Sequence, residues 1–358
     1  MWAMIAKEFR QLRRDRRTLA MMLFVPIVLL VVFGYAASFD VETIPVQVVG
    51  PAAEEISSAL PAPFEVQETD PGAGREEAEV ALRDGEVPVA FVTSASGVTV
   101  LLDGSELFIA NATKTALASV SQRLPQGLAA REEVLFNEEL ETSAIMVPGL
   151  AAMILLFVGT VITSLGVVRE RQAGTFEQLA VMPLRPSDVF LGKIAPYFVV
   201  AAIDMIIVVL AGIWLFDVPF NGSPLVLALG ALLFLFVTLG IGVLVSSVSE
   251  NQGQAIQLAL MLLLPQVMLS GLIFPLSSMA AGVRWIGYGL PLTYFIQISR
   301  GVMLRGAPIE ALWAPFVYLA VIGVVVFGLA TLRFRRSLAP AGTSGRHRAE
   351  PVLEGAST

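Results

Sequence analysis

The sequence contains no cysteine and a single histidine, His347, among 358 residues. The absence of cysteine excludes disulfide frameworks, cysteine metal sites and thiol catalysis. The histidine lies in a polar tail, which argues against histidine-based catalysis and against a histidine metal site. We therefore expect no catalytic site, no metal and no cofactor bound by this chain.

Charged residues are also scarce. They make up 15% of the chain, against 56% hydrophobic residues, and the mean hydropathy is +0.76. A soluble domain of this length needs more surface charge, so the composition indicates a membrane protein. No G-x-x-x-x-G-K-[ST] phosphate loop is present, and the nearest string, LGK at 191–193, lacks the upstream glycine and the hydroxyl residue. The chain is not expected to hydrolyse ATP by itself.

Six apolar runs are long enough to cross the hydrocarbon core of a bilayer. For the first, residues 19–38, a cleaved signal peptide is the alternative, but about twenty apolar residues exceed a typical signal core. Residues 275–311 contain shorter apolar pieces, which we expect to be helices that lie in or dip into the outer interface. The other five spans are predicted at Ile145–Val168, Ile194–Phe216, Pro224–Val248, Ala255–Phe274 and Leu312–Leu332.

Residues 1–18 have the pattern of an amphipathic helix that lies in the membrane interface. Trp2, Ile5, Phe9 and Leu12 recur at helical spacing, and basic residues cover the other face. Such a helix places its apolar side among lipid headgroups and its basic side toward anionic lipid. The predicted anchors to membrane lipids are Trp2, Arg10, Arg13, Arg14 and Arg17.

Residues 39–143 differ from the rest of the chain because they hold 19 of its 30 acidic residues and only five basic ones. Short β-rich runs alternate there with helix-like stretches, which indicates an α/β domain inserted between the first two spans. From Ser105 to about Glu141 the pattern is helical, with a break at Pro125 and Gly127. Strands are predicted at Ile44–Val49, Phe64–Gln67, Val87–Thr93 and Val98–Leu102, and helices around Glu54–Leu60 and Arg75–Leu82.

The distribution of basic residues predicts the orientation of the spans. If the N-terminus is cytoplasmic, the inner segments hold 15 of the 23 lysines and arginines. Both termini are then inside, spans 2–6 occupy residues 144–336, and the α/β domain is outside a multi-pass protein of the cell (cytoplasmic) membrane. The tail at 337–358 is rich in alanine, glycine, proline and serine and is expected to be disordered.

Residues 169–186, RERQAGTFEQLAVMPLRP, form a short charged segment between the second and third spans. Thr175 and Gln178 have the spacing of a capping box, and Pro183 ends the helix after roughly two turns. On the inner side of the membrane, such a helix is well placed to be pushed by a partner. A polar loop that keeps the two spans on the correct side explains the same residues equally well.

The segment also resembles the cytoplasmic coupling helix of type-2 ABC exporter permeases, in which R-E-R-x-x-G-T-x-E-x-L-x-x-x-P-L precedes the third span. Gln172 stands where that family often has an acidic residue. The run LPLTYF at 290–295, followed by Arg300 and Gly301, is similar to the motif before the family's last span, with Leu290 replacing the usual asparagine. The residues predicted to couple to an ATP-binding subunit are Arg169, Glu170, Arg171, Gly174, Thr175, Glu177, Gln178, Leu179, Met182 and Pro183.

The resemblance implies a permease subunit of an ATP-driven exporter for a hydrophobic or amphipathic substrate such as a drug, an antibiotic or a lipid. It also implies two separate ATP-binding cassette subunits, which hold ATP and Mg, and a second permease copy or a paralogue. No nucleic-acid partner is expected. The alternatives are a membrane-anchored receptor or immunity protein that binds through the outer domain, and an ion-coupled secondary transporter. The single intramembrane acid and the lack of an obvious inverted repeat weaken the last alternative.

Asp204 is the one acidic residue near the middle of a span. Leaving it charged against lipid costs at least about 2.5–3.5 kcal/mol, so it is expected to face protein or a water-filled cavity. It is either a polar determinant of the transport path or a hydrogen-bond anchor. The anchor would join it to Gln257 or Gln266 of the fifth span, or to a second copy of the chain.

Small and aromatic residues give two further expectations. Gly159, Thr160 and Thr163 form a small-residue face on the second span, which predicts close helix packing there. Phe234 and Phe236 lie in the fourth span, and both are expected to face lipid.

Overall fold

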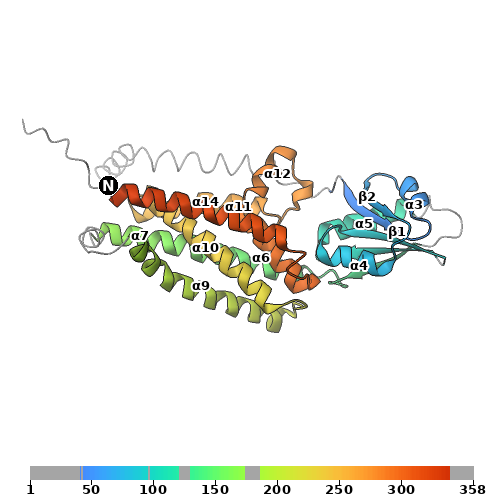
Figure 1. Ribbon diagram of the computed structural model, residues 1–358, viewed down its shortest axis with the longest axis horizontal. Coiled ribbons are helices and arrows are strands. Elements are labelled where there is room, and N and C mark those ends of the chain that lie inside the picture. The colour runs from blue at the N-terminus through green and yellow to red at the C-terminus, as the bar shows by residue number, and fades with distance from the viewer. Residues whose placement is uncertain (1–40, 42, 96, 121–129, 174–185, 339–358) are drawn as a thin grey trace, which may run out of the picture.

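The structure is a computed structural model with two units (Figure 1). An α/β domain lies at one end of a long helical bundle, and we call that end of the bundle the domain end and the opposite end the far end. The predicted interfacial helix at 1–18, the first span at 19–38 and nearly all of the tail lie outside the described residues. The structure describes residues 41, 43–95, 97–120, 130–173 and 186–338.

The α/β domain contains a five-stranded mixed sheet in the order β2-β1-β3-β4-β5. Strand β1 pairs in parallel with both β2 and β3, strands β3 and β4 form an antiparallel hairpin, and β5 pairs in parallel with β4. The predicted strand at Ile44–Val49 forms with those bounds. The strands are β1 (Ile44–Val49), β2 (Phe64–Asp70), β3 (Val89–Ser94), β4 (Gly97–Asp103) and β5 (Ala130–Leu135).

Helices cover both faces of this sheet. Successive side chains of a strand point to opposite faces, so Phe91 and Ala90 of β3 enter different cores. Phe91 packs with Ile56 of α3 and Leu117 of α5, whereas Ala90 packs with Leu82 of α4. The domain therefore has three layers. The helices are α3 (Ala53–Ala59), α4 (Arg75–Asp84) and α5 (Leu107–Val120).

The helical prediction for the end of this domain is wrong. Residues Ala130–Leu135 form the edge strand β5, in register with Val98–Asp103 of β4. The sequence AREEVL consists mostly of good helix formers, but pairing with β4 overrides that local preference. The charged side chains of Arg131 and Glu132 are exposed on this edge, where they discourage pairing with another chain.

The bundle has five helices in its described part that are long and apolar enough to cross a membrane. The second predicted span is one continuous run, in which a π-helical turn joins two α-helices. The fifth begins earlier than predicted because the Asn251 side chain caps it, and it ends at Leu269, before Gly271 turns the chain with φ +85°. The elements are α6 (Thr142–Phe157), η1 (Val158–Ile162), α7 (Thr163–Gln172), α9 (Pro186–Phe216), α10 (Pro224–Val248), α11 (Gln252–Leu269) and α14 (Trp313–Leu338).

Helix α10 is the centre of the bundle. It packs against α7, η1, α9, α13 and α14, and 67% of its most apolar stretch is buried, compared with 17% for α9 and for α14. The predicted close packing of the second span is confirmed, because Thr160 of η1 lies against Thr238 of α10, with 3.5 Å between its Oγ1 and the Thr238 carbonyl oxygen. Small residues allow this approach of the two backbones.

The segment between α11 and α14 forms two helices with different surroundings. Helix α12 (Ala281–Tyr288) exposes Trp285, whose side chain is 75% accessible, whereas nine of the ten residues of α13 (Pro291–Arg300) are buried among α6, α10 and α14. A 3-10 turn, η2 (Leu276–Ser278), precedes them, and a π-helical turn, η3 (Gly301–Arg305), follows. The chain thus dips into the domain end of the bundle instead of lying on it.

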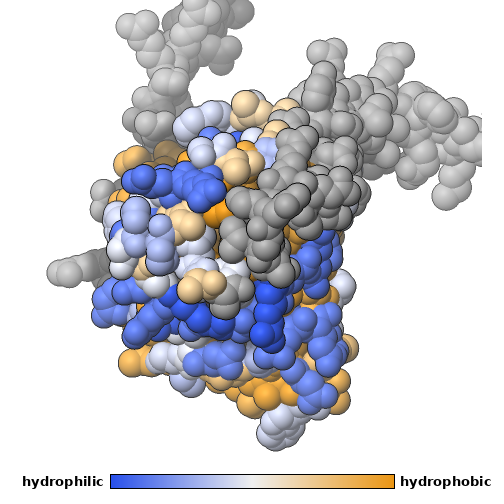
Figure 2. Space-filling view, turned by 90° about the vertical axis from the view of Figure 1, so that its right-hand side faces the viewer, coloured by the Kyte–Doolittle hydropathy of each residue, from blue (hydrophilic) through white to orange (hydrophobic). Residues whose placement is uncertain are grey.

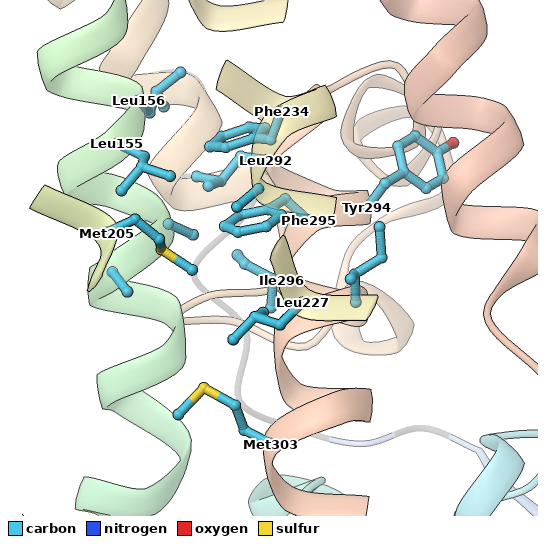
Figure 3. Packing of buried hydrophobic residues seen from close by; sticks show 14 of the residues in the cluster. Leu155, Leu156, Met205, Leu227, Phe234, Leu292, Tyr294, Phe295, Ile296 and Met303 are labelled. Carbon is cyan, nitrogen blue, oxygen red and sulfur yellow. The ribbon is translucent and has the colours of Figure 1, made fainter. Parts of the chain in front are cut away.

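Phe295 of α13 stacks on Phe234 of α10, with 4.5 Å between the ring centroids and 7° between the ring planes (Figure 3). Phe234 is fully buried, so the prediction that it faces lipid is wrong. Helix α10 is apolar all round, and its sequence therefore does not indicate which side is buried. Phe236 is 36% exposed and stacks on Phe327 of α14.

The surface changes character along the molecule. Viewed from the domain end, hydrophilic residues dominate the face of the α/β domain and hydrophobic residues emerge around its edge (Figure 2). On the bundle, α9 and α14 expose large apolar side chains such as Ile206 and Val324. Apolar surface on this scale indicates contact with lipid or with another apolar protein surface.

The crossing of α10 and η1 generates a stability prediction. A Cβ at Gly242 would lie 2.9 Å from the carbonyl oxygens of Gly159 and Thr160, which belong to backbone that cannot move aside locally. We expect Gly242→Ala to destabilise the purified protein by about 1–3 kcal/mol, as overpacked cores do. Thermal unfolding in detergent measures this change.

Gly328→Ala is the matched control, because Gly328 also lies in a helix of the bundle and a Cβ there meets nothing within 4 Å. That variant should keep its Tm or gain slightly, since alanine favours a helix over glycine by roughly 0.5–1 kcal/mol. Equal Tm values for the two variants would contradict the close crossing.

Candidate functional site

The predicted coupling segment begins at the far end of the bundle. Helix α7 ends at Gln172, so Arg169, Glu170 and Arg171 lie in its last turn, and α9 starts again at Pro186. Arg169 is exposed, whereas Glu170 and Arg171 are half-buried. The remaining predicted coupling residues lie outside the described part of the chain: Gly174, Thr175, Glu177, Gln178, Leu179, Met182 and Pro183.

The last turn of α7 is hydrogen-bonded to the turn between α10 and α11. The Arg171 guanidinium donates to the carbonyl oxygen of Ser249 at 3.3 Å, and the Gln252 amide donates to Gln172 Oε1 at 3.1 Å. Ser249 directly follows α10, where helix carbonyls lack partners within the helix and a cationic donor is favourable. These two hydrogen bonds tie the end of α7 to this turn.

The turn itself is stiffened by its own side chains. Asn251 Oδ1 accepts a hydrogen bond from the backbone N–H of Gln254, and Gln254 Oε1 accepts one from the N–H of Glu250. Asn251 and Gln254 thus stabilise the turn and the start of α11. Gln172, which stands where type-2 ABC exporter permeases often have an acidic residue, accepts a hydrogen bond from Gln252 of this turn. The arrangement joins α7, α10 and α11 at the far end.

The structure does not bring the intramembrane polar residues together. Asp204 lies half-buried on α9, and its carboxylate has no hydrogen-bond partner within the described residues. Helix α9 lies along one side of the bundle and α11 toward the other (Figure 1). On α11, the side-chain oxygens of Gln257 and Gln266 are buried without a partner in the described part of the chain. An anchor between Asp204 and either glutamine does not form within this chain.

A second polar site lies at the domain end, where α13 meets the end of α11. Arg300 is 8% exposed, and its guanidinium donates to the carbonyl oxygens of Gly271 and Leu272 at 3.4 and 3.3 Å. These carbonyls follow the end of α11 and cannot be satisfied by the helix. Arg300 therefore stabilises the turn from which the chain enters α12 and α13.

The α/β domain is joined to the bundle by a buried ion pair. Arg305 of η3 lies 3.4 Å from Asp103 at the end of β4, measured from NH1 to Oδ2, and the Asp103 side chain is 1% exposed. The other Asp103 oxygen accepts a hydrogen bond from the Ser105 N–H, which fixes the turn into α5. On the bundle side, Asn221 donates to the Leu304 carbonyl oxygen at 2.7 Å.

The ion pair borders a cavity of about 670 Å³ between the domain and the bundle. Glu106, just before α5, also lines this cavity. Burial raises the pKa of Glu106, the positive charge of Arg300 opposes that shift, and the negative charge of Asp103 adds to it.

This second site is not predicted from the sequence, because more than 190 residues separate Asp103 from Arg300 and Arg305. The available signal was the position of two arginines among buried apolar residues, where an unpaired charge is costly. Within the described residues, no group of three or more His, Cys, Asp or Glu side chains is placed to hold a metal ion.

Comparison with known proteins gives a match over most of the chain. A family model described as ABC-2 family transporter protein matches residues 16–332. The chain is similar to the probable multidrug ABC transporter permease YbhS of Escherichia coli (strain K12), with 28% identity over 94% of this chain and 97% of that protein.

Two further relatives are similar over different lengths. The probable multidrug ABC transporter permease YbhR of the same strain is 26% identical over 94% of this chain and 99% of that protein. ABC transporter G family member 20 of Dictyostelium discoideum is 27% identical over 48% of this chain and 24% of that protein.

The raised pKa of Glu106 gives a pH prediction. A carboxyl whose pKa is raised by folding binds its proton more tightly in the folded state, so stability falls as pH rises from the ordinary carboxyl range toward the folded pKa. Glu106→Gln removes this loss. We expect the variant to have a higher Tm than the wild type at pH 7.5, and a difference close to zero at pH 4.5.

Glu76→Gln is the control, because Glu76 is exposed on α4 and does not line the cavity. Its Tm difference from the wild type should be the same at both pH values. A Glu106→Gln variant that is less stable than the wild type at pH 7.5 would contradict a carboxyl that desolvation makes costly to ionise.

Proposed function

Because the chain belongs to the ABC-2 family of transporter proteins, we propose that it is the membrane-spanning permease subunit of an ATP-driven exporter. The observation that carries this proposal is the family match over residues 16–332, together with similarity over nearly the full length of two proteins named as multidrug permeases. The five long apolar helices agree with it. No feature of the described residues favours the receptor alternative.

We propose a hydrophobic or amphipathic cargo, such as a drug, an antibiotic or a lipid. The names of the two E. coli relatives, both probable multidrug permeases, support this class. The described spans also hold few charges, and a pathway of that kind suits a substrate that partitions into membranes.

The proposed topology has six spans, with residues 19–38 as the first, both termini in the cytoplasm and the α/β domain outside. The far end of the bundle carries Arg169, Arg171 and Arg333, whereas the α/β domain is strongly acidic, a distribution that supports this orientation. In this topology the amphipathic segment 1–18 lies on the inner interface, near the coupling segment.

The proposed complex has two permease subunits, identical or paralogous, and two ATP-binding subunits that hold ATP and Mg. Asp204 supports a second permease copy, because it lacks a partner within the described chain and lies on a helix whose neighbouring side chains Ile203 and Ile207 are exposed. A carboxylate left in that position against lipid is costly. Contact with the second copy or with a water-filled path removes that cost.

The proposed mechanism is mechanical. Closure of the ATP-binding subunits pushes the segment 174–185, and the hydrogen bonds of Arg171 and Gln172 carry the movement to the turn after α10. Because α10 packs against most of the bundle, a shift of its end biases the arrangement of all these helices. Two packings of the bundle, open to the inside or to the outside, then alternate.

Transport in inverted vesicles tests this function. The chain is reconstituted with its ATP-binding subunit, and accumulation of a fluorescent amphipathic dye is followed with ATP and without it. We expect ATP-dependent accumulation for the wild type, and a loss of roughly tenfold or more for Arg171→Ala, because the variant no longer holds the Ser249 carbonyl.

Arg333→Ala is the matched control, since Arg333 is exposed near the far end of α14. It should transport like the wild type, and both variants should still co-purify with the ATP-binding subunit. Absence of ATP-dependent accumulation by the wild type would reject the exporter, whereas normal transport by Arg171→Ala would reject only the proposed route of coupling.

Substitutions of Asp204 test the anchor to a second copy. Asparagine keeps hydrogen-bonding atoms of similar size, so Asp204→Asn should retain most dimer and most transport, whereas Asp204→Leu should lose both. Light scattering in detergent and vesicle transport measure the two properties. Loss of transport in Asp204→Asn with an intact dimer would instead assign Asp204 to the transport path, and two unaffected variants would leave it without either role.

A further inference from the structure

The cavity between the α/β domain and the bundle has the size of a pocket for a drug-sized ligand. Its domain side is formed by residues 84–88, the end of β4 and the start of α5. Its bundle side is formed by residues 270–277, α13, η3 and the start of α14. The side chains that line it come from segments far apart in the sequence, and they include groups of both charges.

Arg300 and Arg305 both line this cavity. A guanidinium carries five N–H donors, and the described residues accept two hydrogen bonds from Arg300 and one from Arg305. The Nε atoms of both residues are enclosed by protein, so the terminal nitrogens are the donors that can reach a ligand. Guanidinium groups form their strongest hydrogen bonds with anionic oxygen atoms, so the cavity favours a bound group of that kind.

Carboxylates line the same cavity. Glu106 lies just before α5 and Glu310 just before α14, and Asp84 and Glu86 line the cavity from the end of α4 and the turn after it. Glu86, Glu106 and Glu310 form no ion pair within the described part of the chain, whereas Asp84 pairs with Arg83 and Asp103 with Arg305. An anion alone would add negative charge beside these acids, and a cation alone would leave the guanidinium donors unsatisfied. A ligand that carries both charges satisfies both sets.

Apolar side chains complete the lining. Ile296 of α13 and Leu312 are buried, and the ring of Trp313 at the start of α14 is 64% exposed. Because Trp313 and Glu310 are both exposed and both line the cavity, it communicates with the surroundings of the protein. The apolar wall lies on the bundle side, where a hydrocarbon chain can leave toward the membrane.

We propose that this cavity binds a zwitterionic amphiphile of the phosphoethanolamine type. Its phosphate accepts hydrogen bonds from Arg300 and Arg305, and its ammonium group lies between Glu106 and Glu310. Its hydrocarbon chain packs on Ile296, Leu312 and Trp313. The ligand touches the α/β domain and the bundle together, so it holds the two units in one arrangement. Binding of this kind needs no ATP-binding subunit and does not depend on the proposed exporter function.

Equilibrium binding to the purified full-length chain in a non-ionic maltoside detergent tests the proposal. Four probes are compared: dodecylphosphoethanolamine, dodecyl phosphate, dodecylammonium and free phosphoethanolamine without a chain. We expect the first to bind at least about tenfold more tightly than each of the others, because each of these lacks one of the three contacts.

Two variants assign the contacts. Glu106→Gln should weaken dodecylphosphoethanolamine about tenfold and should not weaken dodecyl phosphate, which loses a repulsive charge. Arg300→Lys keeps the charge but loses the planar fork, so it should weaken both probes. Glu76→Gln is the control and should bind all probes like the wild type. Thermal unfolding shows that each variant is folded before its binding is compared.

Other outcomes overturn the proposal. Equal binding of the three dodecyl probes, unaffected by Glu106→Gln, would mean non-specific partitioning into the micelle. Tight binding of dodecylammonium that is insensitive to Arg300→Lys would mean a site for cations, and equally tight binding of free phosphoethanolamine would mean that no lipid chain is recognised. No binding of any probe would mean a cavity filled only by water.

Discussion

Backbone groups buried away from water must find partners within the protein, and this constraint determines the domain end of the bundle. Helix α11 ends at Leu269, and the carbonyl groups of the turn that follows accept no hydrogen bonds from a helix backbone. Arg300 bonds to two of them, and the buried helix α13 covers the rest of the segment. Because η3 continues α13, the same packing fixes Arg305, whose ion pair with Asp103 positions the α/β domain.

Helix α10 connects this end of the molecule with the other. In its first half it packs against α13, through the stacked rings of Phe234 and Phe295 (Figure 3). Its later half lies against η1 and α7. The carbonyl beyond its last residue is held by Arg171. Helix α10 therefore links α7 with α13, whose Ile296 and Arg300 line the cavity at the α/β domain.

Part of this architecture is readable from the sequence. Helix α10 has the predicted bounds, Pro224–Val248. A proline in its first turn indicates where the helix begins, and the polar residues after its apolar run indicate where it ends. Strand β5 cannot be predicted from the sequence, because its residues favour a helix locally and form a strand only through pairing with β4. The contact of Arg305 with Asp103 spans 202 positions, and no local pattern predicts a pair at that separation. The predicted coupling residues from Gly174 to Pro183 stay a prediction.

The π-helical turn at Val158–Ile162 has a geometric consequence for the second span. A turn of this type holds about one residue more than an α-helical turn, so the helix beyond it is rotated by roughly 100° about the common axis relative to an uninterrupted helix. The two halves of the span accordingly face different neighbours, since α6 packs on α9 and α13 whereas α7 packs on α10 and α11. Deleting one residue from this turn would rotate the face of α7 that packs on α10 away from that helix, although the side chains of α7 would be unchanged.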